Sequence, residues 1–124
     1  MKANELRIYN YIGNKYYLDR VYDTIGVNYN DVEYKYMGGV GFFNIKDAIP
    51  ILLTEEWLLK FGFEFKGKCI SKNWFYLWKD GSKIVFALAE MQEETGTYLE
   101  IKYVHQLQNL YWCICGEELE IKLQ

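Results

Sequence analysis

The sequence contains few of the residues that most often carry out chemistry. Its 124 residues include one histidine, one proline and three cysteines. Cys69, Cys113 and Cys115 form an odd count without C-x-x-C spacing, which argues against a zinc site and a disulfide framework. We therefore expect no metal, no cofactor and no enzymatic activity. An enzyme would need the fold to bring together a pair such as Cys69 and His105.

Long apolar runs and strongly basic runs are also missing. No segment is apolar over the roughly 20 residues that span a bilayer, and residues 1–10 lack the apolar core of a signal peptide. The net charge is −3, and residues 1–50 hold six basic and six acidic side chains. These features predict a cytoplasmic protein with neither a membrane nor a nucleic acid as partner. The lysines between Lys60 and Lys72 are interpreted as a solvated loop surface.

Aromatic residues, in contrast, are abundant. They make up 19% of the chain, and twelve of them are tyrosines. Tyrosine suits a half-buried sheet surface, and it also suits a binding surface because a rigid apolar ring carries a polar tip. A tyrosine-rich chain of this size is therefore expected to be rich in β-sheet.

The clearest predicted helix lies within Leu53–Phe63. Thr54 is a good N-cap, two glutamates follow it, and Lys60 stands near the helix end, in agreement with the helix dipole. Gly62 is a natural left-handed residue after the C-cap. Leu58 is positioned to contact apolar residues at both ends.

Short β-strands separated by glycine are predicted before this helix. Residues 6–22 read as a hairpin that turns at Gly13-Asn14, and Val32–Met37 and Val40–Ile45 read as strands on either side of Gly38-Gly39. Such a series predicts a small curled sheet, with an SH3-like barrel as its closed form.

An antiparallel meander is predicted after the helix. Asp80-Gly81 separates the apolar strands Phe75–Trp78 and Ile84–Leu88, and Thr97–Tyr103 alternates after a turn at Glu93–Gly96. A second amphipathic helix is predicted over Val104–Cys115, before Gly116. Alternation of Leu119, Ile121 and Leu123 with charged residues predicts a closing strand. The expected fold is a single compact α+β domain over residues 1–124, or lobes 1–50 and 51–124 that share a core.

One helix face offers a candidate interaction surface. On a helical wheel Trp112 falls outside the apolar arc, beside His105, Gln108 and Asn109. An exposed tryptophan among amide side chains is typical of an interface anchor. The alternative is a boundary tryptophan that covers the edge of a sheet.

Three segments carry a resemblance to a known family. They are Asn4–Ile8 with Asn10, Ile51 with Leu53–Phe63, and Val104–Tyr111 with Gly116–Leu119. In these segments the chain resembles a family of short proteins without a known activity, encoded in gut Bacteroidales genomes and their phages or mobile elements. The resemblance implies a bacterial host cytoplasm as the setting. Tyr9 replaces a usual glycine, and Leu52 replaces a second proline.

These observations favour a non-enzymatic protein-binding module, which the resemblance suggests is a phage or mobile-element accessory factor that modulates a host process. The expected partner is a host or phage protein, or a second copy of the chain in a homodimer. The alternative is a small-ligand binder that sequesters a nucleotide signal by stacking bases on tyrosine and pairing phosphates with lysine or arginine.

Overall fold

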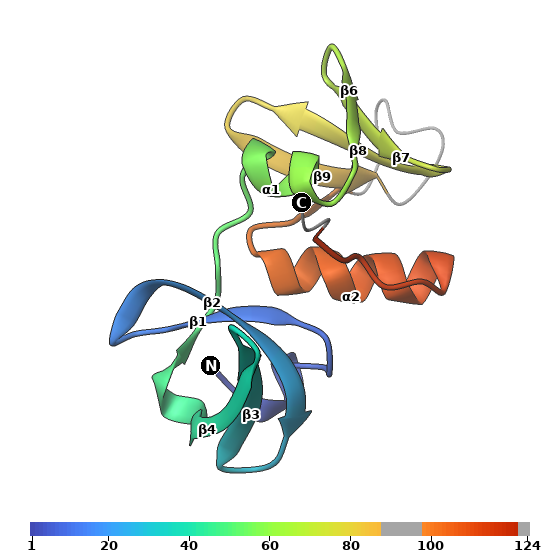
Figure 1. Cartoon of the computed structure of the whole chain (residues 1–124). Helices are drawn as coiled ribbons and strands as arrows, with labels where there is room; N and C mark the ends of the chain where they lie inside the picture. Colours follow the sequence, from blue (N-terminus) through green and yellow to red (C-terminus); the bar gives the residue numbers. More distant parts are fainter. Residues whose placement is uncertain (88–97, 122–124) are drawn as a thin grey trace. The chain divides into compact units, whose positions relative to one another are not determined.

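The structure is a computed structural model, and it describes residues 1–87 and 98–121 (Figure 1). The described residues form an α+β fold with two five-stranded antiparallel sheets and two α-helices. Contacts within the chain group it into two compact units. Unit 1 contains Met1–Leu52 and Tyr103–Asn109, and unit 2 contains Leu53–Lys102 and Leu110–Gln124.

Unit 1 contains the first sheet, in the strand order β4-β3-β2-β1-β5. Its elements are η1 (Ala3–Glu5), β1 (Tyr11–Asn14), β2 (Tyr17–Val27), β3 (Asp31–Tyr36), β4 (Gly39–Asn44), η2 (Ile45–Asp47) and β5 (Ala48–Ile49). The curled antiparallel sheet is confirmed, but β4 and β5 lie at opposite edges and are not paired. The sheet is therefore not closed, and the SH3-like barrel is not confirmed.

The first hairpin turns later than its sequence predicts. Asn14 pairs with Tyr17, so the two-residue loop is Lys15-Tyr16, and the Asn14 side chain accepts a hydrogen bond from the Tyr16 N–H at 2.9 Å. Gly13 lies inside β1 opposite Ile49, where an added Cβ would come within 3.2 Å of the Ile49 side chain. The glycine thus serves the close approach of β5 rather than a turn.

The β3–β4 hairpin is confirmed, and its loop is Met37-Gly38. Both residues have positive φ angles, 49° and 82°, as a type I′ turn requires. Tyr36 and Gly39 therefore form the closing pair of the hairpin.

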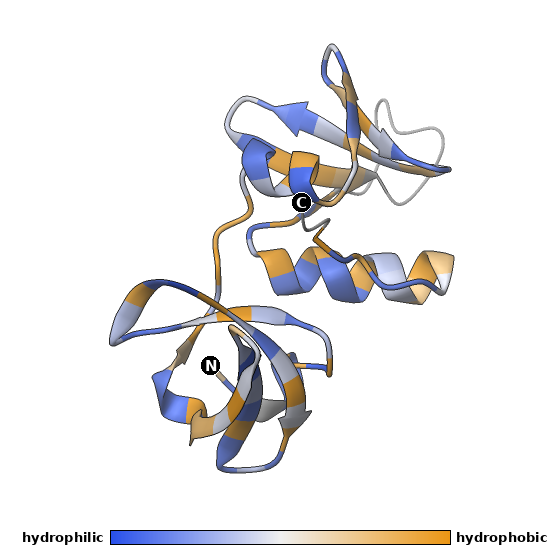
Figure 2. Ribbon diagram, in the orientation of Figure 1, coloured by the Kyte–Doolittle hydropathy of each residue, from blue (hydrophilic) through white to orange (hydrophobic). Residues whose placement is uncertain are grey.

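The core of unit 1 explains several of the tyrosines. Tyr22 is buried with Ile12 and Val32, and its ring centroid lies 4.7 Å from that of Tyr34 and 5.3 Å from that of Phe43. These rings pack in the core of unit 1, and hydrophilic and hydrophobic residues are interspersed along its strands (Figure 2).

Unit 2 contains the second sheet, in the order β10-β9-β8-β7-β6. Its elements are α1 (Glu55–Lys60), β6 (Glu64–Lys66), β7 (Cys69–Lys72), β8 (Phe75–Asp80), β9 (Lys83–Ala87), β10 (Tyr98–Glu100) and the second half of α2 (Val104–Cys115). The Phe75, Phe63 and Tyr111 rings meet in its interior. No helix in the described ranges is both long enough and apolar enough to cross a membrane.

Helix α1 confirms the predicted caps. The Thr54 side chain accepts a hydrogen bond from the Trp57 N–H at 3.3 Å. At the other end Gly62 has a φ of 91°, its N–H donates to the Leu59 carbonyl, and the Phe63 N–H donates to the Leu58 carbonyl. These two bonds form a Schellman motif, which provides hydrogen-bond donors for carbonyls of the last turn that have no partner within the helix.

The remaining predictions for unit 2 had mixed outcomes. The meander β8–β9–β10 and the limits of α2 are confirmed, although Leu88 and the Glu93–Gly96 turn fall outside the described residues. The segment interpreted as a lysine-bearing loop is in fact the hairpin β6–β7. The closing strand is wrong for residues 118–121, which are not in a strand, and Leu123 lies outside the described residues.

Tyr9 adopts the left-handed conformation, with a φ of 81°. Its backbone is held there because its N–H donates to the Thr24 carbonyl at 2.7 Å and its carbonyl accepts from Gln108 at 2.8 Å. A residue with a Cβ pays about 1–2 kcal/mol in this region, whereas glycine does not.

We predict that Tyr9→Gly is more stable than Tyr9→Ala by about 1 kcal/mol, because both variants lose the ring but only alanine keeps the backbone strain. Urea unfolding of the two variants measures the difference. Equal stabilities, or a more stable alanine variant, would show that the positive φ is not retained in solution.

Candidate functional site

The side chains that most often hold metal ions do not gather in the described part of the chain. Among those residues, no group of three or more His, Cys, Asp or Glu side chains is placed to hold a metal ion. Burial raises the pKa of the Cys115 thiol, and a hydrogen bond with Tyr111 opposes that shift. A raised pKa lowers the thiolate fraction and with it the reactivity of the thiol.

Gln108 on the predicted interaction surface is in fact fully buried. Its side-chain oxygen accepts from the Tyr11 N–H at 2.8 Å, and its amide nitrogen donates to the Tyr9 carbonyl at 2.8 Å. The Gln108 amide thus forms the hydrogen bonds that a neighbouring strand would otherwise provide to the Tyr9 carbonyl and the Tyr11 N–H, on either side of Asn10. It holds the N-terminal segment to α2 and is not available to a partner.

Asn109 is half-buried and is also engaged inside unit 1. Its side-chain oxygen accepts from the Arg7 Nε at 3.0 Å and from the Asn10 side chain at 2.8 Å. Asn10 in turn accepts from the Arg7 N–H at 2.7 Å. These bonds fix the loop that precedes β1.

His105 is buried beside Tyr103, with the two rings nearly parallel and their centroids 6.0 Å apart. Burial lowers the pKa of His105, and the negative charge of Glu5 acts weakly in the opposite direction. The imidazole is therefore held in its neutral form at pH 7.

Only Trp112 of the four predicted surface residues is exposed, with 42% of its area open. The surface predicted from the helical wheel is thereby reduced to this tryptophan, and its contact with a partner stays a prediction. The wheel placed all four residues on one side of the helix, but it could not show that unit 1 covers the first half of that side.

We predict that Gln108→Leu lowers the free energy of unfolding by about 2–4 kcal/mol, because it leaves a backbone N–H and a backbone carbonyl without their partners at a partly buried position. Gln106→Leu on the same helix serves as the control. Gln106 is exposed, and water can replace its bond from the Tyr103 N–H at 3.2 Å, so this variant should cost less than about 1 kcal/mol. Urea unfolding of both variants decides the point. Similar losses of stability in the two variants would contradict the prediction, because the hydrogen bonds of the Gln108 amide would then add little to stability.

His105 gives stability a pH dependence. Its folded pKa lies below its unfolded value, so the unfolded chain binds more protons below about pH 6.5 and stability falls as the pH drops from 7.5 to 5.5. A single proton limits the slope to about 1.4 kcal/mol per pH unit. Urea unfolding between pH 5.5 and 7.5 measures this slope. His105→Gln should remove the pH dependence because the chain has no other histidine.

The most accessible apolar feature of unit 1 is its edge strand β4. In its six residues, Gly-Val-Gly-Phe-Phe-Asn, no side chain is charged. Val40 and Phe42 project from the outer face of the sheet and are 68% and 66% exposed. They lie opposite Lys35 and Glu33 of β3, respectively.

The other sheet edges in the described ranges are shorter, and two of them carry charge. β5 has only two residues, β6 contains Glu64 and Lys66, and β10 has three residues, including Glu100. Short edges and charged side chains are the usual means by which proteins discourage strand pairing. β4 lacks both protections.

The hydrogen-bonding pattern shows which backbone groups β4 presents. Tyr36 and Gly39 close a two-residue hairpin loop, so they form a hydrogen-bonded pair, and such pairs alternate along the ladder. Gly41 and Phe43 consequently face β3. The N–H and C=O groups of Val40 and Phe42 point away from the sheet, beside their exposed side chains.

The Tyr34 ring packs directly over Gly41. An added Cβ at Gly41 would lie 2.7 Å from the Tyr34 hydroxyl oxygen, because the tyrosine ring covers the glycine directly opposite it. A larger residue would push the ring or the strand out of place. The Tyr34 ring thus covers the inner face of the sheet at Gly41, while β4 has no strand partner on its other side in the described sheet.

Comparisons of the chain with protein-family models, with curated proteins and with solved structures found no match.

Proposed function

We propose that this chain is a non-enzymatic protein-binding module that adds an extended segment of a partner protein to the β4 edge. The observation that carries the proposal is an uncharged, six-residue edge strand with two exposed apolar side chains. Strand addition needs no reactive group, since backbone hydrogen bonds supply affinity and alternate side chains supply specificity.

The chemistry of the edge defines the partner segment. It must be extended and must offer apolar side chains opposite Val40 and Phe42, on the outer face of the sheet. It must lack proline at the positions that donate to the Val40 and Phe42 carbonyls. In keeping with the resemblance of the sequence, the proposed partner is a host or phage protein, and the chain an accessory factor in the host cytoplasm.

We predict that Phe42→Lys weakens the binding of such a segment by about tenfold or more, because a lysine on the edge opposes strand pairing and removes the apolar contact. Extended peptides of about ten residues would be selected from a displayed library and their affinities measured by fluorescence anisotropy. The selected peptides should alternate apolar residues with others.

Leu18→Lys is the matched control. Leu18 is 77% exposed in the same unit but lies in β2, which is not an edge strand, so this variant should bind the peptides as the unchanged chain does. Equal loss in both variants, or a library that yields no binder, contradicts the proposal. A chain that dimerises through β4 and becomes monomeric on Phe42→Lys also contradicts it, since a second copy then occupies the edge.

A further inference from the structure

A hollow of about 600 Å³ lies in unit 1 where β4 ends. It is lined by Met1, Lys2, Asn4, Tyr29, Asn30, Asn44, Ile45 and Lys46. The Ile45 N–H donates to the Asn30 carbonyl at 2.8 Å, which joins the β2–β3 turn to η2. The Asn28 side chain accepts from two N–H groups of the same turn, each at 2.8 Å. Hydrogen bonds therefore hold in place the two walls of the hollow that the β2–β3 turn and η2 form. The volume suits a small molecule.

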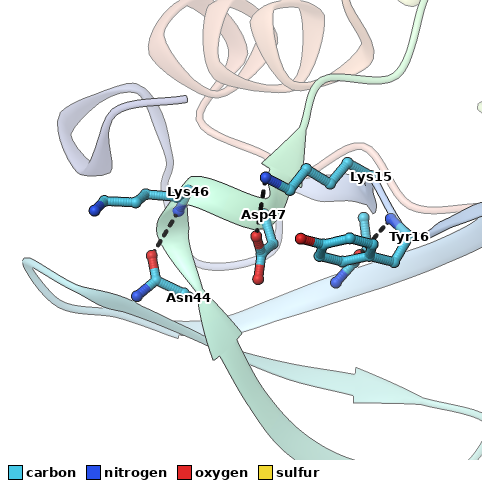
Figure 3. A network of polar contacts seen from close by, with 6 residues as sticks. Lys15, Tyr16, Asn44, Lys46 and Asp47 are labelled. Atoms are coloured by element: carbon cyan, nitrogen blue, oxygen red, sulfur yellow. Dashed lines mark hydrogen bonds and ion pairs between the residues drawn. The ribbon is translucent and has the colours of Figure 1, made fainter.

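The charges around the hollow are of one sign. Lys2 and Lys46 line it and no carboxylate does, although the whole chain has a net charge of −3. Asp47, the neighbour of Lys46, is paired with Lys15 at 3.3 Å. Figure 3 shows the Lys46 side chain extending away from that pair. Neither lining lysine has an ion-pair partner within the described residues, so both ammonium groups remain available to an anion.

The rest of the lining favours a ring beside that anion. Ile45 is buried and Met1 packs against the same core, so the inner wall is apolar. Tyr29 is 87% exposed and offers a ring face for stacking. Asn44 accepts from the Lys46 N–H at 2.8 Å through its side-chain oxygen, which leaves its amide N–H groups to donate to a polar ring edge (Figure 3).

We propose that this hollow binds a nucleoside monophosphate or a phosphate ester of similar size. The phosphate lies between Lys2 and Lys46, and the planar ring lies against Tyr29 and the apolar wall. The site shares Asn44 with the end of β4 but uses neither Val40 nor Phe42, the two side chains on which the proposed function depends. Either proposal can therefore fail without the other.

Titration calorimetry with AMP, GMP and UMP tests the site. Binding of at least one nucleotide is expected, and the double variant Lys2→Gln/Lys46→Gln should weaken it by about tenfold or more, because each lost lysine removes a charge-assisted contact. Tyr29→Ala should weaken nucleotide binding several-fold but leave the binding of inorganic phosphate unchanged, since only the ring stacks.

Lys35→Gln removes one positive charge from an exposed position on β3 and serves as the control. It should bind nucleotide as the unchanged chain does. Three results would overturn the site: no heat of binding up to about 10 mM nucleotide, where a millimolar site would be mostly filled; equal weakening by Lys35→Gln; and binding that the double variant leaves unchanged. Phosphate that binds as tightly as every nucleotide would exclude the ring contact.

Discussion

Unit 1 depends on one buried side-chain amide. Gln108 is separated by 97 residues from the Tyr11 N–H and by 99 from the Tyr9 carbonyl, and it satisfies both. These backbone groups lie at the start of β1, where the chain enters the sheet, and burying them without partners would cost more than most single contacts supply. The first half of α2 is thus required for the N-terminal segment to join the sheet, and Asn109 strengthens the join by holding Arg7 and Asn10.

One side of the same sheet packs aromatic rings into a core, and one of its edges is not paired with another strand. Tyr22, Tyr34 and Phe43 pack together in the core of the unit, and the Tyr34 ring covers Gly41. Across the edge, β4 presents backbone groups and two apolar side chains without a charge to protect them. Its last residue, Asn44, also lines the hollow that carries two lysines. The two candidate surfaces therefore meet at the end of one strand.

Local signals predicted much of the fold. The Thr54 cap and the Gly62 reversal act within a few residues of one another, and both were observed as predicted for α1. The periodicity of Val104–Cys115 predicted the limits of α2, and the Asp80-Gly81 turn predicted the β8–β9 hairpin. In each case the interactions that decide the structure lie within one helix or one hairpin, so the order of residues contains them.

Contacts between segments that are distant in the sequence decided the remaining features of the fold and of the candidate sites. Gly13 resembled a turn residue, but it is in a strand because β5 approaches it closely, and Gln108 resembled a surface residue but is covered by a segment about 100 residues away. The exposed edge at β4 depends on the order of the strands in the sheet, and no local sequence pattern predicts that order. The sequence by itself determined the elements, their caps and their apolar faces, because these follow from short-range geometry. Only the tertiary structure decided which polar side chains are buried, which strand is an edge and where two lysines share a hollow, because these follow from pairings between distant segments.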